Sequence, residues 1–81
     1  MDFTWDNQAR AGYISLLDPE ERVSGVAETT VQLDTLDEAS EINALHSLLL
    51  DFDRNGKLIG IEILSRDAIR NSTLSKARKL T

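Results

Sequence analysis

Side chains with the chemistry and spacing of a calcium-binding loop lie in the stretch DFDRNGKLIGIE, residues 51–62. Such a loop carries oxygen ligands at its first, third, fifth and twelfth positions and a glycine at its sixth. Here these positions hold Asp51, Asp53, Asn55, Glu62 and Gly56. Carboxylate and amide oxygens are the ligands that calcium prefers. The spacing alone would therefore predict a calcium sensor.

The residues that flank this loop do not support that function. A calcium-sensing loop is held between two helices, and each helix needs an apolar face for packing. A helix after Glu62 would turn Arg66, Asp67 and Arg70 inward, and these are charged. The segment LIGIEIL is rich in isoleucine, which favours a strand. We therefore expect no functional metal site, and at most a weak attraction of a cation by the four loop residues Asp51, Asp53, Asn55 and Glu62.

The same stretch is typical of a β-hairpin, because Asn55-Gly56 separates two apolar runs, 45–52 and 57–64. With Asn55-Gly56 as a two-residue turn, the facing pairs on one side are Phe52–Ile59, Leu50–Ile61 and Leu48–Ile63. A competing register has a type I turn that starts at Asp53, with Gly56 as the bulge residue. We favour the first register.

The chain shows no catalytic constellation. Nucleophilic catalysis needs a serine, threonine or cysteine beside an oriented base. The chain has one histidine, His46, and no cysteine, and its four glycines form no phosphate-binding loop. We expect a protein that is not an enzyme and binds no cofactor. An enzyme is the third alternative, and it would need a pocket that joins His46 or Tyr13 to Asp51, Asp53 or Glu62.

Short strand patterns alternate with polar connections along the rest of the chain. Residues 3–5 and 13–17 are strand-like, and Asp18-Pro19 ends the second because proline has no N–H for a ladder. Residues 26–33 alternate between apolar and polar, which predicts a half-buried strand. Residues 34–44 form either an acidic loop or a turn or two of helix. We predict an α+β fold: a small antiparallel sheet of about four to five strands, arranged as a meander of hairpins, with a short C-terminal helix.

The length of 81 residues predicts a single domain, 1–81. We expect its core within 3–70, with Ser65 as a helix N-cap, and residues 71–81 as a short helix or a frayed basic tail. A chain this short buries a modest core, and without cysteine it has no disulfide to add stability. Oligomerisation is the remaining common source of stability.

The sequence also indicates a location. The N-terminus lacks a basic start followed by an apolar run, and the longest apolar run is Leu48–Leu50, too short for a bilayer. The absence of cysteine agrees with a reducing compartment. We expect a soluble, cytoplasmic protein that does not enter a membrane.

The formal net charge of −5 is unevenly distributed. Residues 1–64 are strongly acidic, whereas the bases of residues 65–81 outnumber the single acid Asp67. This basic segment has no aromatic residues to stack on bases, and cations are common near a helix C-terminus. Nucleic acid is therefore not an expected partner.

Three leucines, Leu49, Leu58 and Leu64, fall on the side of the predicted hairpin that is otherwise polar. A sheet with apolar residues on both faces needs cover on both. The C-terminal helix covers one face, so a second subunit or a different protein covers the other. We predict a homodimer with these leucines in the interface, or a heterologous protein partner.

Three stretches together resemble a family of small bacterial and archaeal proteins, the domain of unknown function 2283. They are 5–16, 26–29 and, most specifically, 50–64, where the family has Asp-Tyr-Asp, Gly and then Gly-Ile-Glu-Ile-Leu. The resemblance implies a compact antiparallel sheet with a C-terminal helix and no established activity. The chain departs from the pattern at Arg10, where Asp is usual, at Gly12, where Leu is usual, and in a longer link over 34–46.

These observations favour a non-enzymatic protein–protein interaction module that self-associates. The alternative is an acidic, antitoxin-like protein that neutralises a basic partner. The acidic stretch Asp34 to Glu41 is the feature behind this alternative.

Overall fold

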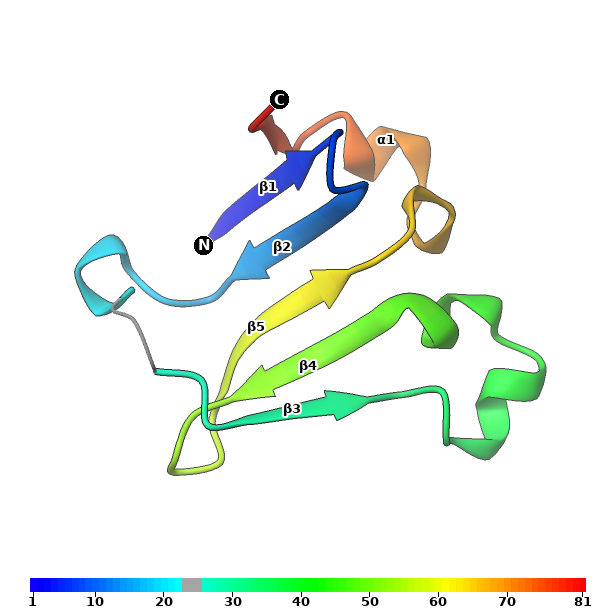
Figure 1. Cartoon of the computed structure of the whole chain (residues 1–81), viewed down its shortest axis with the longest axis horizontal. Coiled ribbons are helices and arrows are strands. Elements are labelled where there is room, and N and C mark those ends of the chain that lie inside the picture. Colours follow the sequence, from blue (N-terminus) through cyan, green and yellow to red (C-terminus); the bar gives the residue numbers. More distant parts are fainter. Residues whose placement is uncertain (23–25) are drawn as a thin grey trace.

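Six strands form a single sheet in the computed structural model, which describes residues 1–22 and 26–81 (Figure 1). In chain order they are β1 (Asp2–Asp6), β2 (Ala11–Ser15), β3 (Thr29–Gln32), β4 (Leu48–Phe52), β5 (Leu58–Ile63) and β6 (Arg78–Lys79). Their order across the sheet is β3-β4-β5-β2-β1-β6. The predicted α+β fold is confirmed, although the sheet is mixed and has one strand more than the four to five expected.

Two features of this sheet depart from a meander of hairpins. Strand β2 pairs with β5 rather than with β3, its successor in the chain. Strand β6 lies parallel to β1, whereas every other pairing is antiparallel. The strands on both sides of the N-terminal β1–β2 hairpin, β5 and β6, therefore come from a distant part of the chain.

The helical elements are all short. The α-helix α1 covers Asn71–Leu74, and single 3-10 turns cover Pro19–Glu21, Asp37–Ser40, Asn43–Ser47 and Arg66–Ala68. Two of these turns occupy the acidic segment 34–44 and its continuation. Ser65 caps the turn at Arg66–Ala68, because its hydroxyl accepts a hydrogen bond of 3.2 Å from the Asp67 N–H.

One face of the sheet is apolar, because residues that face each other on neighbouring strands project to the same side. Two rows across the strands carry this face. The first is Phe3, Ile14, Ile61, Leu50 and Val31, and the second is Trp5, Gly12, Ile63 and Leu48. Trp5 and Ile63 are buried at the centre of the core.

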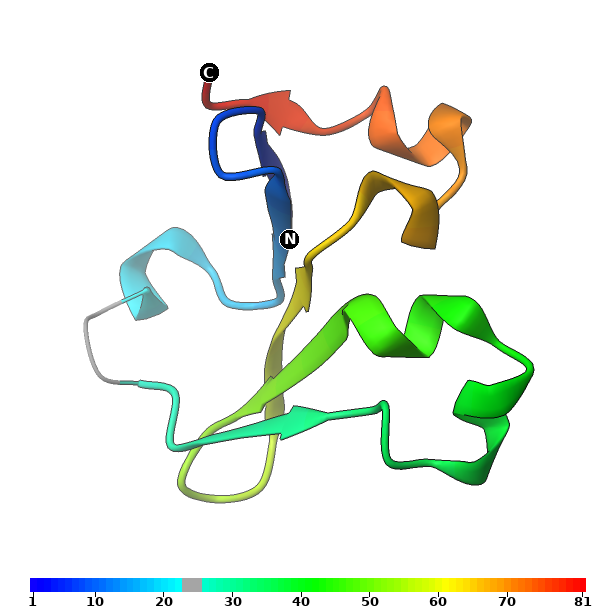
Figure 2. The same cartoon turned by 45° about the vertical axis from the view of Figure 1, so that its right-hand side comes forward.

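The segment after β5 covers this face over β1, β2 and β5. Leu74 and Ala77 are buried against Trp5 and Ile63, with Ala68 and Ile69 packed beside them. Figure 2 shows this segment running along one end of the sheet before it reaches β1. The core therefore extends past residue 70, further along the chain than the range 3–70 that we expected.

Hydrogen bonds attach the end of this segment to β1. The Arg78 guanidinium lies 2.8 Å from the Asp2 carboxylate and lowers its pKa, chiefly through their hydrogen bond. The Leu80 N–H donates to the Trp5 carbonyl at 2.8 Å, and the Thr81 hydroxyl donates to Asp6 at the same distance. Residues 71–81 are thus a short helix followed by a paired strand, rather than a frayed tail.

Strand β3 lies at the other edge of the sheet, and all four of its residues are exposed. The sequence predicts a half-buried strand over 26–33, and both the length and the burial of that strand are wrong. The covering segment packs on β1, β2 and β5, so Val31 remains 39% exposed at the uncovered end of the apolar face.

The β4–β5 hairpin is confirmed, and it combines features of the two predicted registers. Its turn is the type I turn that starts at Asp53, since the Gly56 N–H donates to the Asp53 carbonyl at 3.0 Å and Gly56 has φ 77°. Further along, the pairs Leu50–Ile61 and Leu48–Ile63 follow the register that we favoured.

A bulge at Ile59 reconciles the two. Phe52 pairs with Leu58 and Asp51 with Gly60, so Ile59 has no opposite residue. The predicted Asn55-Gly56 two-residue turn and the Phe52–Ile59 pair are therefore wrong. The bulge keeps the isoleucines on the apolar face while the turn adopts the geometry that Asp53 and Gly56 favour.

We expect Leu74→Ala to lower the free energy of unfolding by about 2–4 kcal/mol, because it leaves a cavity beside Trp5 and Ile63. Urea unfolding followed by circular dichroism measures this change. Leu80→Ala is the matched control, since Leu80 is 54% exposed, and we expect it to change stability by less than about 0.5 kcal/mol. Equal effects of the two substitutions would contradict a core that includes residues 71–77.

Candidate functional site

The face of the sheet opposite the core is polar and carries some of the residues that the sequence singles out, among them Tyr13, Asp51 and Glu62. One row across it is Thr4, Tyr13, Glu62, Leu49 and Gln32, and the next is Asp2, Ser15, Gly60, Asp51 and Thr30. We call these two rows the polar face. Tyr13, which the enzyme alternative would place in a pocket, belongs to this face.

Tyr13 lies diagonally across the polar face and contacts Asp51. Its hydroxyl donates a hydrogen bond of 2.8 Å to one Asp51 oxygen, and the Thr30 hydroxyl donates one of 2.6 Å to the other. The ring passes over Gly60, where a Cβ atom would overlap the phenol. The close approach of the Tyr13 ring therefore requires a glycine at position 60. The Asp51 carboxylate joins three strands, β2, β3 and β4.

The surroundings of Tyr13 keep its phenol neutral. Burial, the hydrogen bond to Asp51 and the negative charges of Asp51 and Glu62 raise the pKa of Tyr13 to about 12. The hydroxyl thus remains protonated at neutral pH and acts as a hydrogen-bond donor rather than as a base or nucleophile. The cluster can hold strands together and present polar atoms to a partner.

The chain has a single tyrosine, so its near-ultraviolet absorbance titrates Tyr13 alone. We expect a midpoint near pH 12 and a shift towards 10, the ordinary value, in Asp51→Asn. The folded pKa lies above the unfolded one. The stability contributed by the neutral phenol is therefore complete below pH 10 and is lost as the pH rises through 12.

Circular dichroism recorded at each pH checks that the chain is still folded during this titration. A midpoint near pH 10 in a folded chain would contradict the contact with Asp51.

The residues that match a calcium loop do not converge. Asp51 and Glu62 lie in β4 and β5, where a sensor would have helices. The Asp53 carboxylate accepts hydrogen bonds of 2.9 Å from the N–H groups of Asn55 and Lys57, within the turn. In the described residues, no three acidic or histidine side chains are placed to hold a metal ion.

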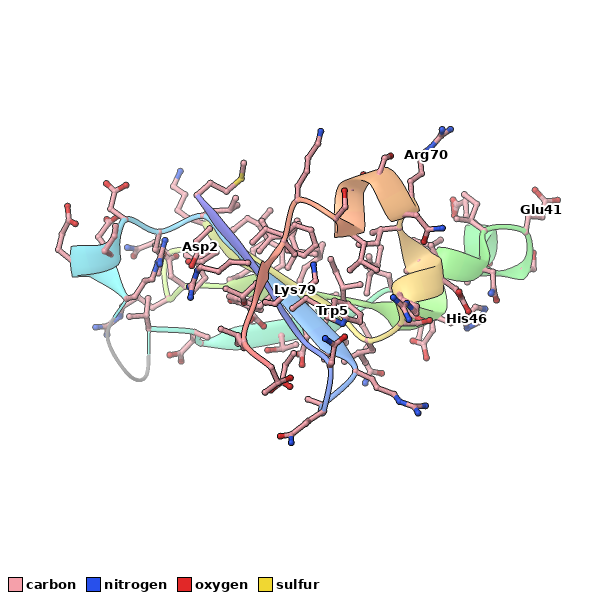
Figure 3. All side chains as sticks on the ribbon, turned by 90° about the horizontal axis from the view of Figure 1, so that it is seen from above. Asp2, Trp5, Glu41, His46, Arg70 and Lys79 are labelled. Carbon is pink, nitrogen blue, oxygen red and sulfur yellow. The ribbon has the colours of Figure 1, made fainter. Side chains whose placement is uncertain are left out.

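His46 lies apart from these residues, in the turn that precedes β4. Its Nε2 atom is 2.9 Å from the Ala39 carbonyl, a contact that joins the two 3-10 turns of the segment 37–47. Figure 3 shows it towards the end of the molecule where Glu41 also lies. The hollow beside Asp53 is lined by Val26, Glu28, Arg54 and Asn55, and it brings neither His46 nor Tyr13 to that carboxylate.

The three leucines expected in an interface are spread along the hairpin. Leu49 is half-buried on the polar face opposite Glu62, and Leu58 is 38% exposed next to the bulge. Leu64 is 45% exposed at the far end of β5, about 20 Å from Leu58 along an extended strand. Leu49 pairs with Gln32 of the exposed edge β3, and Leu58 pairs with Phe52, which pairs with Thr29 of β3. Leu64 lies beyond the end of β3, beside Ser47.

A family model described as "Protein of unknown function (DUF2283)" matches residues 2–65. The chain belongs to this family. Strands β1 to β5, with Tyr13, Gly60 and Asp51, fall within the match, and the covering segment with α1 and β6 falls beyond it. No curated protein and no solved structure matches the chain. Among the described residues, no helix has the length and apolar character to cross a membrane.

Within this DUF2283 chain, sequence reasoning missed Thr30 and the contact between Tyr13 and Gly60. An isolated glycine inside a strand marks a bulge or a close approach, so Gly60 carried a usable signal. The role of Thr30 had no signal of its own, because it depends on the pairing of β3 with β4.

Arg10 is a further feature that the sequence did not reveal. It closes the β1–β2 turn with φ 54°, in the left-handed region that glycine adopts readily and other residues rarely. The same turn is built on Asp6, whose carboxylate accepts from the N–H groups of Gln8 and Ala9. A side chain with a Cβ costs about 1–2 kcal/mol in this conformation.

We expect Arg10→Gly to raise the free energy of unfolding by about 0.5–1 kcal/mol, because glycine removes this cost and loses some entropy of its own. Arg10→Ala is the matched control, since it removes the guanidinium and keeps the strain. Thermal unfolding of both variants measures the difference. A glycine variant no more stable than the alanine variant would contradict the strained backbone.

Proposed function

We propose that the protein is a non-enzymatic interaction module that pairs with a second copy of itself through strand β3. The observation that carries this proposal is the composition of that edge. Its four residues, TTVQ, are all exposed and include no charge and no proline. Monomeric proteins protect their edge strands with charged residues and prolines, because an open edge recruits another strand.

The opposite edge of the sheet differs in this respect. Strand β6 has two residues, Arg78 and Lys79, and both are cationic. A short, charged edge disfavours pairing with another copy. The contrast supports β3 as the edge that self-associates. Strand β3 is the lowest strand of the sheet in Figure 1.

Charge also favours one register of a two-fold, antiparallel β3–β3 contact. If Thr30 faces Thr30 of the second copy, Thr29 faces Val31 and Glu28 faces Gln32, and no like charges meet. If Val31 faces Val31, Glu28 faces Asp34, and two carboxylates oppose each other. We propose the register centred on Thr30.

Exposed apolar side chains near this edge add area to the contact. Val31 is 39% exposed on the core side of the sheet, and Leu58 is 38% exposed on β5. Leu36 and Ile42, in the segment after β3, are 47% and 51% exposed. A strand of four residues alone buries little surface, so these side chains would supply much of the apolar contact that a stable dimer needs.

Light scattering after size exclusion, over a range of concentrations, tests this proposal. We expect the wild type to have twice the 9.0 kDa mass of the chain. For Val31→Lys, we expect the concentration at which half of the protein is dimeric to rise at least tenfold. Thr73→Lys is the matched control, because it introduces the same charge on α1, away from β3. A wild-type monomer at every concentration would overturn the proposal.

Cross-linking tests the register, because the chain has no cysteine of its own. We expect Thr30→Cys to form a disulfide-linked dimer under mild oxidation, since directly opposed residues have Cβ atoms close enough to bridge. Thr73→Cys, exposed on α1, should cross-link far more slowly. Faster linkage of Val31→Cys than of Thr30→Cys would favour the other register.

A second candidate function is the neutralisation of a basic protein. Asp34, Asp37, Glu38 and Glu41 are all exposed, and none forms a salt bridge with the described residues. Figure 3 shows Glu41 at one end of the molecule. Co-purification with a small basic protein would support this function, and a complex that persists at high salt would count against a mainly electrostatic contact.

A further inference from the structure

A hollow of about 530 Å³ lies where the β1–β2 turn meets the chain leaving β5. Trp5 and Asn7 line one side of it, and Leu64 and Arg66 belong to the segment that leaves β5. Arg10 completes the lining from the end of the turn. The hollow is separate from the polar face and from the β3 edge.

The charges around this hollow are unusual for an acidic protein. Its lining residues include two arginines, Arg10 and Arg66, and one acid, Asp67, which gives a local excess of positive charge. In the part of the chain that the structure describes, neither arginine forms a salt bridge. Two such residues beside one concave surface are suited to an oxyanion, because a guanidinium donates paired hydrogen bonds to carboxylate or phosphate oxygens.

The backbone of Arg10 is an independent observation in favour of this site. Arg10 occupies a left-handed position that glycine or asparagine would fill without strain. Strained residues persist where the surrounding structure holds them, and they are concentrated at functional sites. An arginine at this position adds a cationic residue to the lining of the hollow, which glycine would not supply.

The remaining lining sets the size and character of the ligand. Leu64 is 45% exposed and offers apolar surface. The Trp5 indole N–H donates a hydrogen bond of 3.1 Å to the Asn7 side-chain oxygen. The Asn7 side chain is itself fixed, since its amide donates to the Thr81 carbonyl at 2.8 Å. We propose that this hollow binds a small organic oxyanion, with its phosphate or carboxylate group at Arg10 and Arg66 and its apolar part against Leu64.

Nuclear magnetic resonance tests this site directly, because the chain has one tryptophan and its indole N–H signal reports on the hollow. The probes are phenyl phosphate, benzoate and inorganic phosphate, each titrated against sodium chloride of equal ionic strength. We expect a saturable shift of the Trp5 signal with a Kd on the order of millimolar for the two ring compounds. Inorganic phosphate should bind more weakly, because it lacks an apolar part.

The variants separate binding from folding. Arg10→Gly and Arg66→Gln should each weaken phenyl phosphate at least fivefold, although the first is expected to be the more stable chain. Arg54→Gln is the matched control, since it removes an exposed arginine at the β4–β5 turn, and its affinity should match the wild type. Asp67→Asn should tighten binding about two- to fivefold, because it removes the only carboxylate in the lining.

Two results would overturn the proposal. One is a Trp5 signal that moves no further with the oxyanions than with chloride. The other is an equal loss of affinity in Arg54→Gln, which would show that the protein responds only to its total charge. Stronger binding of inorganic phosphate than of phenyl phosphate would exclude the apolar contact with Leu64.

Discussion

The burial of Leu74 and Ala77 against Trp5 and Ile63 is the contact on which the rest of the structure depends. A six-stranded sheet with one apolar face needs a second layer, and this chain supplies that layer with a single short segment. The segment covers the half of the sheet around β1, β2 and β5. At the other edge, β3 is exposed and Val31 of the apolar face remains 39% exposed, and this asymmetry distinguishes the two ends of the molecule.

The polar face shows how the sheet is organised without a second covering layer. Asp51 accepts hydrogen bonds from Tyr13 and Thr30, so one carboxylate links side chains from β2, β3 and β4. Gly60 leaves the space that the phenol needs. A polar cluster of this kind rigidifies a sheet because each member is satisfied by another, and the DUF2283 match covers all four residues.

Local patterns predicted the elements whose residues decide their own geometry. The two apolar runs on either side of Asn55-Gly56 predicted the β4–β5 hairpin, and Asp53 with Gly56 allowed the turn that forms. What the sequence did not predict depends on contacts between distant segments. Strand β6 is two basic residues paired only because β1 lies beside it, and β3 is exposed because the covering segment ends before it. The hollow beside Arg10 likewise arises only when the β1–β2 turn and the segment after β5 come together.

The position of β5 between β4 and β2 has a consequence for synthesis of the chain. The hairpin of β1 and β2 emerges from the ribosome long before its neighbour, because Ile14 faces Ile61. Until β5 is made, the hydrogen-bonding groups along one side of β2 have no strand to pair with, and Ile14 has no cover. Pairing across such a long separation is slow, since loop closure precedes the contacts that reward it. The nascent protein therefore passes through a stage in which a chaperone or a neighbouring nascent chain can reach β2, although β2 lies inside the finished sheet.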